Sequence, residues 1–150
     1  MGLLAVMAGL FGCNKAPKPA QHTISEISAV SISCGHMDYS FHYYFWIHKE
    51  QGKWLFDAEC FTHNKEEETV FENREVSGEA MDELFEILER RDSITYAENY
   101  IKPKGSPFVV LDGTTYGFCM TFSDGKQYVT CDCQKELEEY FYRLAEQVNE

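Results

Sequence analysis

The sequence predicts an α+β fold, in which an antiparallel sheet of about five strands carries two helices on one face. Three observations carry this prediction: aromatic and polar residues alternate in two regions, each region contains a glycine turn, and two segments place apolar residues at helical spacing. The expected order is three strands, a helix, two strands and a helix. Since short turns join consecutive strands, we expect antiparallel pairing.

The first region predicts a β-hairpin followed by a third strand. From Tyr39 to Ile47, successive side chains alternate between two faces, as in a strand. A second predicted strand extends from Trp54 to Thr62, with Gly52 in the intervening turn. A third strand is expected at residues 68–75. The stretch 27–33 either extends the first strand or forms a separate one.

The turn also predicts which residues face each other in the hairpin. With Gln51 and Gly52 at its centre, Tyr43 faces Cys60 and Phe45 faces Ala58 on the side expected to form the core. On the opposite side, Tyr44 faces Glu59 and His42 faces Phe61.

The second half of the chain predicts both helices. Ser77 is suited to cap a helix that continues to about Arg91, because apolar residues repeat at helical spacing after it. Residues 92–113 contain Pro103, Gly105 and Pro107 and are expected to form a long ordered loop. Strands at 115–122 and 127–133 flank an Asp-Gly turn, and a helix over 134–147 closes the chain.

Composition and charge indicate a folded acidic domain that does not bind nucleic acid. Apolar residues form 44% of the 150-residue chain and aromatic residues 15%, which is a globular composition. The formal net charge of −12 would repel nucleic-acid phosphates and anionic lipid headgroups.

The amino-terminal segment predicts export and lipid attachment. Residues 1–13 read as a signal peptide ending in Leu10-Phe11-Gly12-Cys13, which resembles the lipobox of bacterial lipoproteins, so Cys13 is the expected lipidation site. Residues 14–24 contain Pro17 and Pro19 and are expected to form a flexible tether before a single domain at 25–150. The expected location is extracytoplasmic, at the cell membrane through the lipid anchor.

Two departures from the usual signal leave alternatives open. Phe11 is bulkier than the residue usual at its position, and no Lys or Arg precedes the apolar run, so the true start codon is open and we expect it upstream of Met1. The alternatives are a buried amino-terminal helix with Cys13 as an ordinary thiol, or a cleaved signal without an anchor.

Beyond Cys13, the sequence holds five cysteines, an odd number that cannot all pair internally: Cys34, Cys60, Cys119, Cys131 and Cys133. We interpret them as small core residues with room for one disulfide, whose connectivity stays open. The spacing of Cys131 and Cys133 is too tight for a zinc knuckle.

The side of the hairpin away from the expected core is the candidate binding surface. It displays Tyr44, Trp46, Leu55 and Phe61, and aromatic side chains are enriched at contacts with other molecules. The expected partner is a protein, a peptide or a glycan. The alternative is that the long loop or a second copy of the chain covers this surface.

The alternative to a binding surface is a metal site with an enzymatic role. His42, Glu59 and His63 could approach one another on the same face, and two histidines with a carboxylate are a legitimate ligand set. The simpler interpretation is separate surface histidines. Because no nucleophile elbow and no glycine-rich phosphate loop occur, we expect no cofactor and rank binding above catalysis, with a metal-dependent or other cell-envelope enzyme as the alternative.

The chain resembles small uncharacterised lipoproteins of Gram-positive, often gut, bacteria. The resemblance rests on Leu111-Asp112-Gly113-Thr114-Thr115-Tyr116, on the Asp124-Gly125 turn and on the Glu-Leu-Glu-Glu-Tyr-Phe segment around Leu137 to Phe141. It covers about residues 25–150 as an architecture. It implies no established activity and assigns no catalytic residue.

Overall fold

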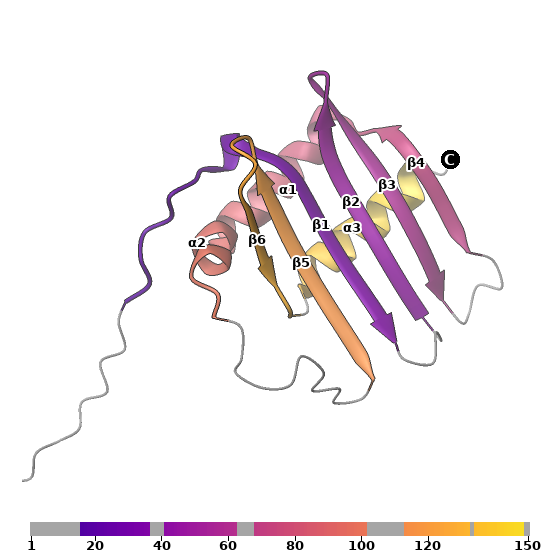
Figure 1. Cartoon of the computed structure of the whole chain (residues 1–150). Helices are drawn as coiled ribbons and strands as arrows, with labels where there is room; N and C mark the ends of the chain where they lie inside the picture. Colours follow the sequence, from indigo (N-terminus) through magenta and orange to yellow (C-terminus); the bar gives the residue numbers. More distant parts are fainter. Residues whose placement is uncertain (1–15, 37–40, 63–67, 102–112, 133, 149–150) are drawn as a thin grey trace, which may run out of the picture.

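The structure is a computed structural model that describes residues 16–36, 41–62, 68–101, 113–132 and 134–148. These residues form an antiparallel sheet in the order β4-β3-β2-β1-β5-β6, with helices against one face (Figure 1). The strands are β1 (Ile27–His36), β2 (Phe41–Glu50), β3 (Lys53–Thr62), β4 (Thr69–Glu75), β5 (Thr114–Phe122) and β6 (Gln127–Thr130). The helices are η1 (Ile24–Glu26), α1 (Gly78–Arg90), α2 (Ser93–Glu98) and α3 (Lys135–Val148). The α+β class is therefore confirmed.

The sheet has six strands rather than five because residues 27–36 form a strand of their own. β1 pairs with both β2 and β5, which places Val30 between Ile47 and Met120. All three of these side chains are fully buried. β1 is thus the strand that joins the two halves of the chain, which were predicted as separate regions.

The predicted hairpin register is confirmed. Gln51 and Gly52 both adopt positive φ angles, 50° and 80°, as a tight two-residue turn requires. Tyr43 pairs with Cys60 and Tyr44 with Glu59. Because side chains alternate along a strand, this register fixes which β2 residues enter the core.

The core lies between the sheet and helices α1 and α3. Ser77 caps α1 by accepting a hydrogen bond from the Ala80 amide at 3.2 Å. Phe141 of α3 stacks on Phe45 of β2, with ring centroids 5.7 Å apart. Tyr140 donates a hydrogen bond to the Ala80 carbonyl at 2.8 Å and so connects α3 to α1.

The predicted loop at 92–113 was partly wrong, because its first residues form helix α2. Asp92 adopts a left-handed conformation (φ 50°) that ends α1, and α2 begins at the next residue. Ser93, Ile94 and Ala97 are buried, so tertiary packing favours this short helix despite its modest sequence signal. Residues 102–112 lie outside the described residues.

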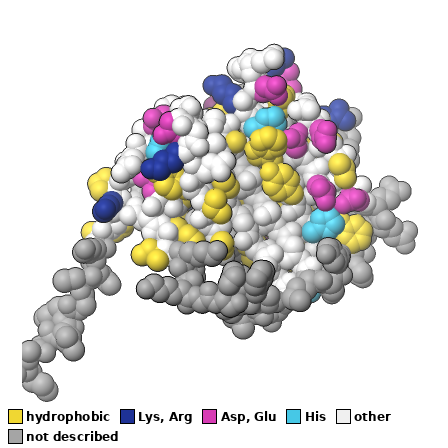
Figure 2. All heavy atoms as spheres, in the orientation of Figure 1, with side chains coloured by type: hydrophobic (Ala, Val, Ile, Leu, Met, Phe, Trp, Pro, Cys, Tyr) yellow, Lys and Arg dark blue, Asp and Glu magenta, His cyan; other side chains and the backbone are white. Residues whose placement is uncertain are grey.

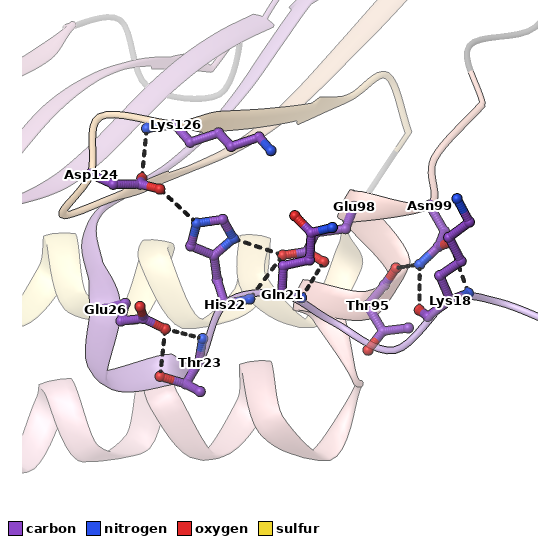
Figure 3. A network of polar contacts seen from close by, with 10 residues as sticks. All are labelled: Lys18, Gln21, His22, Thr23, Glu26, Thr95, Glu98, Asn99, Asp124 and Lys126. Carbon is purple, nitrogen blue, oxygen red and sulfur yellow. Dashed lines mark hydrogen bonds and ion pairs between the residues drawn. The ribbon is translucent and has the colours of Figure 1, made fainter.

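Residues 18–22 lie against α2 and the β5–β6 turn (Figure 3). The Lys18 amide donates to Asn99 Oδ1 at 3.1 Å, and the Gln21 amide donates to Glu98 Oε2 at 2.7 Å. The imidazole of His22 bridges Glu98 and Asp124. Part of the segment expected as a tether therefore contacts the domain. Within the described residues, no helix has the length and apolar character needed to cross a bilayer.

Candidate functional site on the open face of the sheet

The sheet face opposite α1 and α3 carries the candidate site. In the described part of the chain the helices lie on the other face (Figure 1), so the even-numbered side chains of β2 point away from them. Hydrophobic side chains and one histidine lie together in the upper middle of the open face, and other histidines lie nearer its sides (Figure 2).

A groove of about 450 Å³ runs across this face, within the size range of small-ligand sites. Its lining comes from four strands: Ser28, Ala29 and Ser31 of β1, Tyr44, Trp46, His48 and Lys49 of β2, Cys119 and Thr121 of β5, and Gln127 of β6. Small residues of β1 and β5 form the floor, and the larger aromatic residues of β2 form one wall. The difference in side-chain size between neighbouring strands creates the groove.

Tyr44 is the most exposed aromatic residue in the wall, with 45% of its surface accessible. Partial burial raises the pKa of its phenol above the usual value, and the electrostatic influence of Asp57, and of Cys119 where its thiol is ionised, acts in the same direction. Tyr44 therefore presents a neutral aromatic ring at neutral pH.

Trp46 is held in place from one side. Its ring stacks on His48, with centroids 3.9 Å apart and an angle of 17° between the planes. His48 Nε2 lies 3.3 Å from Asp57 Oδ2, close enough for an ion pair but without hydrogen-bond geometry. Asp57 in turn accepts a hydrogen bond from the Asn73 amide at 2.6 Å. Contacts running to the β4 backbone thus orient the Trp46 ring.

The groove offers neutral polar groups rather than charged ones. Burial raises the pKa of the Cys119 thiol above its usual value, which keeps the thiol protonated at neutral pH. Lys49 has an odd position in β2 and points towards the helix side, where its Nζ lies 5.7 Å from the ring centre of Trp54. Hydroxyls, an amide and aromatic rings therefore dominate the lining.

The structure separates the four residues of the predicted binding surface into two groups. Tyr44 and Trp46 line the groove. Leu55 and Phe61 lie on the same face, paired with His48 and His42, but do not line the groove.

Sequence reasoning missed the groove residues outside the hairpin, which are Ser28, Ala29, Ser31, Cys119, Thr121 and Gln127. A signal existed, because Ser31 and Ser33 alternate with Val30, Ile32 and Cys34 as the two faces of one strand. This pattern identifies groove residues only if β1 pairs with β2, and the sequence left that pairing open.

The structure brings part of the predicted metal set together. His42 Nε2 lies 3.4 Å from Glu59 Oε1, and Glu68 completes the cluster with its Oε1 3.2 Å from the same nitrogen. His63 and Cys13 lie outside the described residues. No disulfide joins Cys34, Cys60, Cys119 and Cys131, the four described cysteines, to one another.

No family model matches this chain, and neither the curated proteins nor the solved structures contain a match.

Proposed function

We propose that the chain is a lipid-anchored, extracytoplasmic binding domain whose groove binds a neutral glycan. The observation that carries this proposal is the groove itself, in which the aromatic rings of Tyr44 and Trp46 stand beside hydroxyl and amide groups. Sugars present apolar C–H faces and rings of hydroxyl groups, which such a lining complements by stacking and hydrogen bonding.

The position of the groove favours a glycan over a peptide. An extended peptide adds to a sheet edge, where free backbone amides and carbonyls are available. The groove instead lies mainly over β2, β1 and β5, each of which pairs with a strand on both sides, and it reaches the edge strand β6 only at Gln127. Recognition here depends on side chains, which suits a ligand rich in hydroxyl groups.

The charge distribution favours a neutral ligand. The protein carries a net charge of −12, which disfavours acidic polysaccharides. Among the described residues that line the groove, none supplies a carboxylate with which to attract a cationic partner. The groove would therefore select among neutral glycans by their shape and by the arrangement of their hydroxyl groups.

A glycan array probed with the purified domain tests this proposal. We expect retention on one class of neutral oligosaccharide. Tyr44→Ala should weaken the affinity about tenfold, as is typical of aromatic residues that a ligand buries on binding. Tyr96→Ala is the matched control, because Tyr96 has nearly the same exposure (44%) but lies on α2. Ser31→Trp should abolish binding by filling the floor.

Two outcomes would overturn the glycan proposal. One is binding that is unchanged in Tyr44→Ala and Ser31→Trp. The other is a dimer in solution that Ser31→Trp dissociates, which would identify the groove as an interface between two copies of the chain.

The anchor is tested separately at Cys13. We expect a lipid-sized mass gain and membrane retention when the protein is expressed in a bacterial host with its upstream region restored. Both should disappear in Cys13→Ala. An unmodified cytoplasmic protein in both cases would contradict the anchor and leave glycan binding to be judged on its own.

A further inference from the structure

A second cluster on the open face lies at the other end of β2 from the groove. His42 of β2, Glu59 of β3 and Glu68, the residue before β4, place one nitrogen and two carboxylate oxygens within 4.8 Å of one another. His42 and Glu59 lie on the paired strands β2 and β3, and Glu68 directly precedes β4, which pairs with β3, so strand pairing brings the three side chains together. Each is partly exposed, with side-chain accessibilities of 28%, 55% and 47%.

The spacing of these atoms matches the coordination shell of a small divalent cation. Zinc binds imidazole nitrogen and carboxylate oxygen at about 2.0–2.2 Å, which puts neighbouring ligands of a tetrahedral ion about 3.4 Å apart. His42 Nε2 lies 3.2 Å from Glu68 Oε1 and 3.4 Å from Glu59 Oε1. An ion could enter with little rearrangement of the side chains.

The His42 ring is oriented for this role. It stacks on Phe61 with centroids 5.7 Å apart and an angle of 18° between the planes. Its Nδ1 is buried and has no hydrogen-bond partner, so Nε2 is the nitrogen available to a ligand. Packing therefore holds the ring with its accessible nitrogen facing both carboxylates.

The two carboxylates lack a compensating fixed positive charge. Among the ion pairs of the described residues, those of Lys and Arg go to Glu75, Glu136 and Glu83, and none reaches Glu59 or Glu68. A dication would neutralise the repulsion between the two carboxylates. This gives the site a reason to bind a cation beyond its geometry.

We propose that His42, Glu59 and Glu68 bind one zinc ion, with water completing the coordination shell. The imidazole ligand favours zinc over calcium and magnesium, which prefer shells made of oxygen alone. This proposal does not depend on glycan binding, since the groove lining shares no residue with the cluster.

Calorimetric titration of the full domain with zinc chloride tests the site. We expect one equivalent to bind, and Glu59→Gln, Glu68→Gln and His42→Gln each to weaken the affinity about tenfold or more. His48→Gln is the matched control, because His48 lies on the same strand and face but beside a single carboxylate, Asp57. That variant should keep the wild-type affinity.

Cobalt spectroscopy distinguishes this site from a site with cysteine ligands. Cobalt bound by nitrogen and oxygen gives d–d bands without the near-ultraviolet charge-transfer band of thiolate ligands. We expect no charge-transfer band at one equivalent. A strong band, a failure of zinc to bind, or equal zinc affinity in wild type and all three cluster variants would overturn the proposal. Circular dichroism of each variant checks that it is folded, and Ser31→Trp should leave zinc binding unchanged.

Discussion

His22 Nδ1 lies 2.9 Å from Glu98 Oε1, although 76 residues separate the two in the chain. The other ring nitrogen lies 3.0 Å from Asp124 Oδ2 in the β5–β6 turn (Figure 3). His22 therefore attaches the stretch just before the first strand to α2 and to the β5–β6 turn at once.

The three groups of this contact have shifted pKa values. Hydrogen bonds with Asp124 and Glu98 raise the pKa of His22 above 6.5. The hydrogen bond from His22 lowers the pKa of Asp124 below 3.8. Burial raises the pKa of Glu98, but the hydrogen bonds from Gln21 and His22 outweigh it and leave the pKa below 4.5.

These shifts predict a pH window of stabilisation. The contribution of His22 is complete below its unfolded pKa of 6.5 and is lost as the pH rises through its higher folded value. The carboxylates contribute above their unfolded values and lose this contribution as the pH falls through their lower folded pKa values. All three contribute together between about pH 4.5 and 6.5.

Thermal unfolding of wild type and His22→Gln across pH checks this window. We expect the variant to melt at a lower temperature, with the largest difference near pH 5.5 and smaller differences near pH 3 and pH 9. A difference that is independent of pH would show that His22 contributes by packing on Phe122 rather than by charge.

The phenol of Tyr140 gives a second prediction. Tyr140 is 2% exposed and donates its hydroxyl to the Ala80 carbonyl, and burial raises the pKa of this phenol. Tyr140→Phe should lower the free energy of unfolding by about 1 kcal/mol, because the hydrogen bond that joins α3 to α1 is lost, while the Ala80 carbonyl keeps its place in the α1 hydrogen-bond pattern.

Tyr96→Phe is the matched comparison in urea unfolding. The Tyr96 hydroxyl donates to Asp132 Oδ2 at 2.9 Å, and partial burial together with Asp132 raises its pKa to about 12. Since Tyr96 is 44% exposed, its loss should cost less than about 1 kcal/mol. Equal costs for the two variants would contradict the role assigned to the buried hydrogen bond.

The exposure of the described cysteines predicts an order of alkylation. Cys131 is exposed and should react first with iodoacetamide, whereas Cys119 should react more slowly because burial raises the pKa of its thiol. Cys34 is 4% exposed and should react only on unfolding. Peptide mass mapping over time measures this order, and early labelling of Cys34 would indicate an open or loosely packed sheet.

The sequence was sufficient to predict the strands and helices that are determined by residues close together in the chain. The turn at Gln51 and Gly52 determined the register of β2 and β3, and Ser77 marked the start of α1 through a hydrogen bond to its own first turn. These features depend on residues close together in the chain, so periodicity and turn chemistry are sufficient to predict them.

The groove and the cluster of His42, Glu59 and Glu68 could not be predicted completely, because both depend on contacts between segments that are distant in the chain. Ser31 meets Trp46 on one side and Cys119 on the other only because β1 pairs with both β2 and β5. Glu68 joins His42 across β3, a contact between strands that are not neighbours in the sheet. Helix α2 likewise depends on the burial of Ile94 and Ala97 rather than on a strong sequence pattern.

The fluorescence of Trp46 tests the central claim, glycan binding in the groove, most directly. The chain contains two tryptophans, so Trp54→Phe leaves Trp46 as the reporter in the groove wall. Titration with cellohexaose, xylohexaose, mannohexaose and chitohexaose should produce a saturable change in emission with at least one sugar, and adding Ser31→Trp to Trp54→Phe should abolish glycan retention on the array. No change with any neutral oligosaccharide, under conditions in which the variant is folded, would contradict the account.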